Sequence, residues 1–175
     1  SGSFSEIDHQ YDEAWIGGPG ISSWNTEEGT LGWLKDDYTI YFQSEKTGYS
    51  HLYLHNTSPQ IKTIQRTVPL TQGKWEIYNV QLSKDGKSFY ITANQTHPGD
   101  RNLLKVDIAT KKMTPVLNQE GYHDCTLSPD EKTIAIRYSD KNTPWELYTA
   151  TNTSNAAKSR ITYSTTEQFQ SYEWR

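Results

Sequence analysis

The sequence contains little that could hold the chain together through covalent cross-links or metals. Cys125 is the only cysteine among 175 residues, which excludes an intrachain disulfide and a four-cysteine zinc site. We expect Cys125 to be a small, buried thiol beside a strand. The sequence also has no uninterrupted apolar run of about eighteen residues, the length that a membrane-spanning helix requires.

Positive charge is scarce as well. The chain has 17 Lys and Arg against 21 Asp and Glu, for a formal net charge of −4. Surfaces that bind nucleic acid or anionic membranes need clustered basic residues. The composition therefore argues against both kinds of partner.

Aromatic residues, in contrast, are abundant. The 12 Tyr, 6 Trp and 4 Phe make up 13% of the chain. Each aromatic side chain buries a large area, so a chain that is only 33% hydrophobic can still fill a core. Many Tyr and Trp residues beside a single Met favour β-structure over helix.

One short pattern occurs three times, at residues 32–42, 81–91 and 126–136. Each copy has a strand end, a polar turn and a second strand of aromatic and β-branched residues, and Asp85-Gly86 is a strong hairpin signal. Asp36, Asp85 and Asp130 hold the same place, 49 and 45 residues apart. A period of this size indicates a repeat protein.

Each repeat is predicted to contain four strands. First strands are expected at 30–34, 78–82 and 124–127, and second strands at 39–43, 88–92 and 133–138. Third strands are expected at 51–54, 103–108 and 146–149, and short fourth strands at 70–71, 113–114 and 161–162.

Units of four strands and this length are blades of a β-propeller. We predict an all-β fold, a partial β-propeller of about three four-stranded antiparallel blades at about 29–77, 78–123 and 124–175.

Residues 1–28 are a lead-in segment, and we interpret its first three residues as a cloning scar. Residues 169–175 are interpreted as a strand leading out of the third blade, cut at a domain boundary. Three blades leave open edges, through which copies could associate.

The lead-in segment contains a Gly17-Gly18-Pro19-Gly20 cluster. A His-Gly-Gly-Pro loop forms the oxyanion site of some α/β-hydrolase peptidases, but Ile16 occupies the histidine position here. The chain also lacks the Gly-x-Ser-x-Gly nucleophile elbow. We therefore predict a turn.

Several motifs together resemble one enzyme family. Residues 41–53 are similar to its Ser-Glu-x-x-Gly-Tyr-x-His-Leu-Tyr blade, and residues 70–77 to its Leu-Thr-x-Gly-x-Trp-Glu-Val link between blades. Residues 99–103 and 125–130 continue in the same order. Over roughly residues 29–150 the chain resembles the dipeptidyl-peptidase-IV-like branch of the prolyl oligopeptidase serine peptidases.

The resemblance implies a division of labour between domains. In such proteins an eight-bladed N-terminal propeller caps a C-terminal α/β-hydrolase domain that bears the Ser, Asp and His. This chain would be the last three blades, gating access and helping to bind peptide substrates for a hydrolase domain outside it. It implies a secreted, periplasmic or membrane-anchored parent. We expect no catalytic residue, metal ion or cofactor in the chain itself.

Carboxylates are expected where such a protein holds the cationic amino end of a peptide. Glu27 and Glu28 form a tempting pair, but the family carries its paired glutamates in an earlier blade. Two solvated acids in a turn is the better interpretation. Trp24 is a candidate substrate contact, because the family places an aromatic residue in the connection before this blade.

The histidines and sequons have simpler interpretations. His51 and His55 share a face of one predicted strand but have no third ligand nearby, which disfavours a zinc site. His123 and Asp124 are strand neighbours that point to opposite faces, so they cannot form a catalytic pair.

Asp100-Arg101 is expected to be a loop ion pair. Sequons at Asn56, Asn94 and Asn152 are glycosylation sites only in a host that glycosylates.

An alternative to the peptidase interpretation is a free-standing, TolB-like propeller that acts as a protein-interaction module. An enzyme with an unrecognised site of its own has little support in the sequence. A hydrolase domain following in the reading frame would favour the first interpretation, and a stop codon the second.

Overall fold

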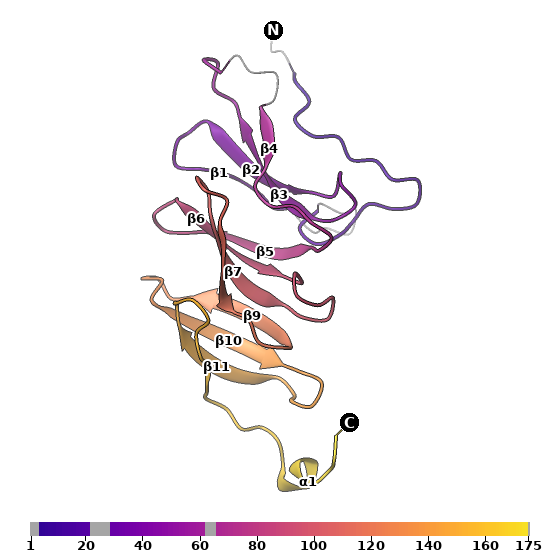
Figure 1. Ribbon diagram of the computed structural model, residues 1–175, viewed down its shortest axis with the longest axis vertical. Helices are drawn as coiled ribbons and strands as arrows, with labels where there is room; N and C mark the ends of the chain where they lie inside the picture. Colours follow the sequence, from indigo (N-terminus) through magenta and orange to yellow (C-terminus); the bar gives the residue numbers. More distant parts are fainter. Residues whose placement is uncertain (1–3, 22–28, 62–65, 175) are drawn as a thin grey trace. The chain divides into compact units, whose positions relative to one another are not determined.

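The fold consists of three four-stranded antiparallel sheets, one for each repeat, in a computed structural model that describes residues 4–21, 29–61 and 66–174 (Figure 1). No sheet closes on itself. The predicted all-β class and partial propeller are therefore confirmed. The chain divides into two compact units, residues 1–80 and 81–175.

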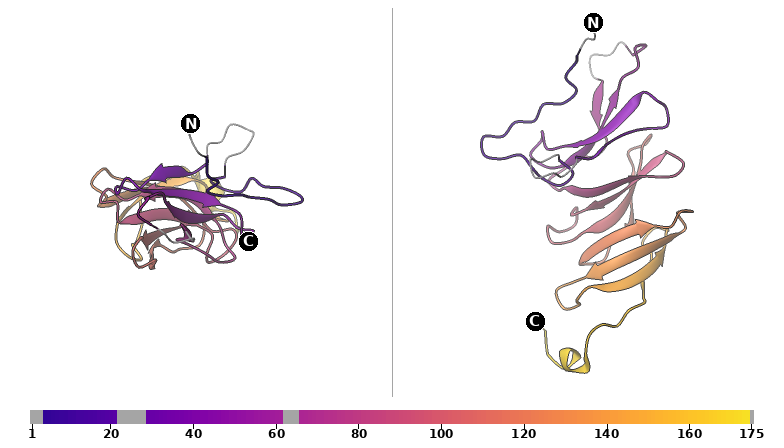
Figure 2. Two further views of the ribbon diagram at one scale, coloured as in Figure 1. Left: turned by 90° about the horizontal axis from the view of Figure 1, so that it is seen from above. Right: turned by 180° about the vertical axis from the view of Figure 1, so that it is seen from behind.

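Sheet one lies in the first unit and has the strand order β1-β2-β3-β4. Its strands are β1 (Leu31–Trp33), β2 (Thr39–Ser44), β3 (His51–Asn56) and β4 (Thr67–Pro69). The lead-in segment lies beside this sheet (Figure 2). Gln43 Nε2 donates hydrogen bonds to the carbonyls of Pro19 (3.1 Å) and Ile77 (2.8 Å), so a buried amide ties the lead-in to the sheet.

Sheets two and three repeat this order, β5-β6-β7-β8 and β9-β10-β11-β12. Sheet two contains β5 (Ile77–Leu82), β6 (Ser88–Ala93), β7 (Asn102–Asp107) and β8 (Met113–Leu117). Sheet three contains β9 (Tyr122–Leu127), β10 (Thr133–Ser139), β11 (Glu146–Thr151) and β12 (Ser159–Arg160).

The core of the second unit joins one face of sheet two to one face of sheet three. Tyr90 and Leu117 from sheet two and Ile134 and Ile136 from sheet three belong to one buried cluster. Asn152 Nδ2 donates a hydrogen bond to the Tyr90 hydroxyl oxygen (2.7 Å). Burial of apolar area at about 25 cal/mol per Å² makes such a face the main source of stability.

The central strands of these two sheets differ in burial. All six residues of β6 are buried. In β10 burial alternates, so that Ile134, Ile136 and Tyr138 are buried while Thr133, Ala135 and Arg137 are exposed. Alternation of this kind marks a strand with one covered and one open face.

The repeated Asp turn has a shared hydrogen-bond pattern. Asp85 Oδ1 accepts hydrogen bonds from the Ser83 hydroxyl (2.6 Å) and the Lys87 amide (2.9 Å). Asp130 accepts the equivalent bonds in sheet three. The residue after each aspartate adopts positive φ, and the three are Asp37 (62°), Gly86 (73°) and Glu131 (57°).

Three predictions about the ends of the sheets are wrong. The fourth strand of sheet one is Thr67–Pro69 and not 70–71, and that of sheet three is Ser159–Arg160 and not 161–162. Residues 169–175 do not start with a strand, because Phe169 lies in a short helix, α1 (Glu167–Gln170). The Thr166 hydroxyl caps this helix by accepting from the Phe169 amide (3.2 Å), a local preference that strand alternation does not register.

In the described part of the chain, no helix combines the length and apolarity needed to cross a membrane.

Candidate functional site

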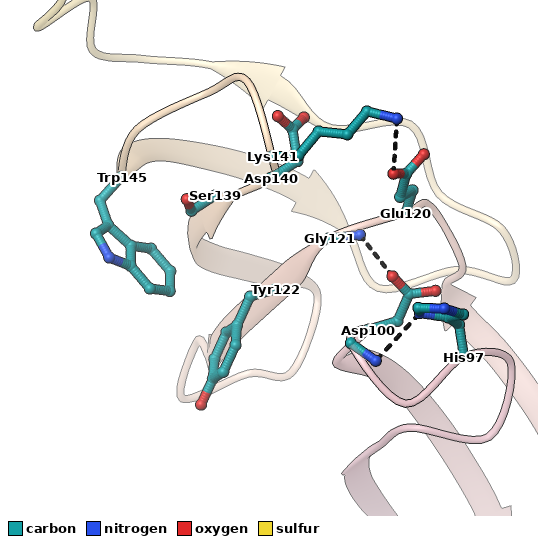
Figure 3. Close-up of a pocket in the computed structure, with 10 residues that line it drawn as sticks. His97, Asp100, Glu120, Gly121, Tyr122, Ser139, Asp140, Lys141 and Trp145 are labelled. Atoms are coloured by element: carbon teal, nitrogen blue, oxygen red, sulfur yellow. Dashed lines mark hydrogen bonds and ion pairs between the residues drawn. The ribbon is translucent and has the colours of Figure 1, made fainter. Parts of the chain in front are cut away.

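A pocket of about 600 Å³ opens where three loops of the second unit meet (Figure 3). The loops are 94–101 between β6 and β7, 118–121 between β8 and β9, and 140–145 between β10 and β11. All three join strand ends on the same side of sheets two and three. We call this cavity the loop-end pocket.

Asp100 fastens two of these loops together. Its side chain is 92% buried, since only 8% is exposed, and its Oδ1 accepts a hydrogen bond from the Gly121 amide (2.9 Å). Gly121 has φ of 109°, and a Cβ there would lie 2.7 Å from the Ser139 carbonyl oxygen. Glycine is required at this point because neither the dihedral nor the space suits another residue.

Two aromatic side chains form a corner on one side of the pocket, as Figure 3 shows. Tyr122 and Trp145 meet edge to face, with ring centroids 5.3 Å apart. The Arg137 guanidinium lies 4.9 Å from the Trp145 ring centroid, and that of Arg101 5.5 Å from the Tyr122 centroid. Both rings remain over a third exposed (37% and 46%), so they present apolar surface to a ligand.

Carboxylates line the other part of the pocket. Asp140 accepts hydrogen bonds from the amides of Asn142 (2.9 Å) and Thr143 (2.7 Å) and from the Tyr138 hydroxyl (2.8 Å). Burial alone would raise the pKa of Asp140, but these hydrogen bonds outweigh it and hold the pKa below its ordinary value. Asp140 is therefore ionised near neutral pH.

Glu120 and Lys141 form an exposed ion pair at the rim of the pocket, 3.4 Å apart. Both side chains are about two-thirds exposed, so solvent screens the pair and a ligand can displace it.

His123 follows the pocket residue Tyr122 in β9 and is fully buried. Its Nδ1 is 2.9 Å from the Arg101 carbonyl oxygen and its Nε2 is 3.1 Å from Lys158 Nζ. Burial first, and then the Lys158 charge, lower the pKa of His123 to about 4. A neutral ring that donates through Nδ1 and accepts from Lys158 fits both contacts.

The predicted opposition of His123 and Asp124 is observed. Asp124 points away from His123 and pairs with Arg137 at 2.9 Å. The predicted Asp100-Arg101 pair is arranged differently, because the Arg101 guanidinium donates to the carbonyls of Pro98 (2.9 Å) and Asp100 (2.7 Å). Neither pair has the geometry of a catalytic dyad.

The histidines of β3 make structural contacts. His51 is buried between the Thr71 hydroxyl (3.1 Å) and the Gly73 carbonyl (3.0 Å), and His55 contacts the Thr67 hydroxyl at 2.7 Å. Burial lowers the pKa of both. Among the described residues, no group of three or more His, Cys, Asp or Glu is arranged to hold a metal ion.

Cys125 is partly buried and packs against the core of the second unit. Burial raises the pKa of its thiol to about 12, so the group stays protonated and unreactive at neutral pH.

The candidate contact Trp24 and the pair Glu27 and Glu28 lie outside the described residues. Sequence reasoning missed the loop-end pocket altogether. Part of the pocket could have been found in the sequence, because three of its lining residues flank predicted strands at one end of the third repeat. They are Tyr122, Asp140 and Trp145. Which loops meet was not readable from that pattern.

The side chain of the sequon residue Asn152 donates two hydrogen bonds. Its Nδ2 donates to the Tyr90 hydroxyl and to the Glu131 carbonyl, each at 2.7 Å. A glycan on this nitrogen would break both contacts.

Comparisons with known proteins agree on one family. The model of the family described as "Dipeptidyl peptidase IV (DPP IV) N-terminal region" matches residues 9–145. The match runs through sheets one and two and ends just before β11.

Curated relatives carry related names. "Probable dipeptidyl peptidase 4" of Emericella nidulans is 28% identical over 159 residues, covering 74% of this chain and 20% of that protein. A protein of the same name from Aspergillus flavus is 27% identical over 146 residues, covering 72% and 18%. "Dipeptidyl peptidase 4" of Arthroderma otae is 27% identical over 137 residues, covering 69% and 17%. The chain thus spans about a fifth of the length of the curated relatives that it matches.

Proposed function

Because the chain belongs to the family of dipeptidyl peptidase IV N-terminal regions, we propose that it is a non-catalytic propeller segment of a dipeptidyl-peptidase-IV-like serine exopeptidase. It gates access and helps to bind peptide substrates for an α/β-hydrolase domain outside the chain. The observation that carries this proposal is the family match, which runs through successive sheets of one design.

The open face of sheet three supports the idea of a larger propeller. In sheet two, Tyr90 lies on the face that sheet three covers. The position 45 residues later is Ala135, which is exposed. Since repeats stack by presenting equivalent faces to their neighbours, a further sheet of the same protein covers the Ala135 face in this proposal.

The division of chemistry also fits the sequence, which contains no Gly-x-Ser-x-Gly elbow. The loop-end pocket supplies what a binding element needs instead. The Tyr122 and Trp145 rings offer apolar contact area, and the carboxylates of Asp140 and Glu120 offer hydrogen-bond acceptors. We place the contact with the peptide at this pocket.

An activity assay tests the proposal directly. The 175-residue chain should release no Gly-Pro or Ala-Pro dipeptide from chromogenic substrates. The protein encoded by the reading frame that continues past residue 175 should release them, and a serine-directed phosphonate should abolish that activity. Phosphonate-sensitive turnover by the chain alone would contradict the proposal. A stop codon after Arg175 would favour the TolB-like interaction module instead.

The binding role has its own test in the longer protein. Trp145→Ala should raise KM roughly twofold to tenfold with little change in kcat, because it removes contact area and leaves the chemistry in place. Trp33→Ala, at an exposed tryptophan on β1, is the matched control. Equal KM values for the two variants would show that the loop-end pocket does not contact the peptide substrate.

A further inference from the structure

The lead-in segment is unusually acidic for its length. Residues 4–21 contain Glu6, Asp8, Asp12 and Glu13 and no Lys or Arg. We call residues 4–21 the acidic strap. Its three aromatic residues, Phe4, Tyr11 (77%) and Trp15 (74%), are mostly exposed.

Hydrogen bonds to the β2–β3 loop and neighbouring strand residues hold the strap in place. The Glu45 amide donates to Gln10 Oε1 (2.8 Å), and Glu45 Oε2 accepts from the Gly17 amide (3.1 Å). The Ser50 hydroxyl donates to the Pro19 carbonyl (2.6 Å). These contacts lie on both sides of Trp15, so the aromatic part of the strap is fixed at two points.

A cavity of about 620 Å³ lies between the strap, the β2–β3 loop, and residues Glu76 and Tyr78. Tyr11 and Trp15 line it from the strap, and Glu45, Lys46 and Glu76 line it from loops between strands. We call it the strap cavity. All of its lining residues belong to the first unit.

Asp12 sets the direction of the Trp15 backbone. Its Oδ1 accepts hydrogen bonds from the amides of Ala14 (2.8 Å) and Trp15 (3.2 Å). These bonds also lower the pKa of Asp12, so its carboxylate is charged at neutral pH. Asp12 thus fixes the Trp15 backbone, and both residues line the same cavity.

The charge of the strap cavity is negative. Asp12, Glu45 and Glu76 contribute carboxylates, and Lys46 is the single basic residue among the described residues of the lining. The Lys46 ammonium already lies 3.0 Å from Asp8 Oδ1 and 4.0 Å from the Tyr53 ring centroid. Lys46 is therefore already paired with Asp8, outside the lining.

We propose that the strap cavity binds a basic side chain, Arg or Lys, of a polypeptide segment. A ring face beside carboxylates attracts a cation that has an apolar stem, because the quadrupole and the negative charge act together. An exposed aromatic patch with a polar rim is also a common mark of an interaction site. This site shares no residue with the loop-end pocket, where we place the peptide contact.

Calorimetric titration with short blocked peptides tests the proposal. The probes are acetyl-Gly-Arg-Gly-amide, its Lys counterpart and its citrulline counterpart, which keeps the shape of arginine without the charge. The blocked ends exclude binding through a terminal amine. We expect the Arg and Lys peptides to bind more tightly than the citrulline peptide by roughly tenfold at low salt, and the difference to shrink as salt screens the carboxylates.

Single substitutions locate the binding. Trp15→Ala should weaken the Arg peptide roughly twofold to tenfold, and Asp12→Asn, which keeps the acceptor oxygen, by roughly twofold to fivefold. Glu13→Gln removes the same charge from an exposed strap residue outside the lining and should change affinity least. Unchanged near-UV circular dichroism would show that each variant is folded.

Three results would overturn the proposal. One is equal affinity for the Arg and citrulline peptides. Another is binding that Trp15→Ala leaves unaltered while Trp33→Ala reduces it, which would move the site to another exposed tryptophan. A free-ended Gly-Pro dipeptide that binds more tightly than the blocked Arg peptide would likewise contradict recognition of a basic side chain.

Discussion

Sheets two and three have the same strand order and the same Asp turn, yet equivalent positions of the two sheets, which lie 45 residues apart, carry different side chains with different burial. Tyr90 is buried where Ala135 is exposed. Gly86 turns the first hairpin where Glu131 turns the second. The comparison teaches that the repeat specifies the backbone, while the neighbours of each sheet decide which side chains the backbone can carry.

The largest difference is expected at the covered and open faces. Tyr90→Ala should lower the free energy of unfolding by about 3–5 kcal/mol, because it empties a buried aromatic site and leaves Asn152 without one partner. Ala135→Tyr in the 175-residue chain should change it by less than about 0.5 kcal/mol. Urea unfolding measures both values.

The same Ala135→Tyr change becomes a sharper test in the longer protein. If a further sheet covers this face, the added ring should overpack the interface and cost about 1–3 kcal/mol. An equally small effect in both proteins would mean that the Ala135 face remains open.

The next effect concerns two ion pairs of sheet three. The Glu146 side chain is fully buried and pairs with Arg160 at 2.7 Å, and it also accepts from the Thr162 and Ser164 hydroxyls and the Ser164 amide. Asp124 and Arg137 form an exposed pair at 2.9 Å. Glu146→Gln should therefore lower Tm far more than Asp124→Asn does. We expect Asp124→Asn to change the free energy of unfolding by no more than about 1 kcal/mol. Similar shifts in Tm would contradict this ranking.

Sheet three should also be the acid-sensitive one. Its His123 has a pKa of about 4, below the value of an unfolded chain. The unfolded state therefore binds the proton more readily, and stability present above about pH 6.5 is lost as pH falls toward 4, by up to about 3 kcal/mol. The matched position in sheet two is Tyr78, which carries no imidazole.

His123→Gln isolates this contribution. Unfolding measured at pH 7 and at pH 4.5 should show a smaller pH difference for the variant than for the parent chain. An identical pH dependence would place the acid sensitivity elsewhere.

The smallest effect is at the turns. Gly86→Ala should cost about 1 kcal/mol, because a Cβ disfavours the positive φ of 73°. Glu131→Gly should raise the free energy of unfolding by about 0.5–1 kcal/mol, because glycine adopts the φ of 57° without strain. Loss of the hydrogen bond from the Lys84 amide to Glu131 Oε1 (2.6 Å) offsets part of this gain. Thermal unfolding of both variants gives the two signs, and a loss of stability in Glu131→Gly would show that this contact outweighs the strain.

Much of the fold was predictable because strands and hairpins are local. The alternation at 103–108 and the Asp turns predicted β6, β7 and β10 to within a residue or two of their ends. The fourth strands of sheets one and three were misplaced because they are short edge strands, whose pairing depends on the neighbouring strand more than on their own residues. The helix at Glu167–Gln170 was missed because a capping threonine and a single turn leave little periodic signal.

The candidate sites were far less predictable. Trp24 was singled out from a resemblance, and it lies outside the described residues. Trp145 and Trp15 were not singled out, because nothing in their local sequence separates an exposed aromatic beside a cavity from one that fills a core.

The amino-acid sequence by itself determined the repeat, the β class and the family, since all three reside in spacing and in short motifs along the chain. Only the tertiary structure decided that Asp100 reaches Gly121, that Tyr90 is covered while Ala135 is open, and that Asp12 and Trp15 face a cavity with Glu45. These contacts join residues from different loops and strands. Their energies depend on distance in space, which the order of residues does not specify.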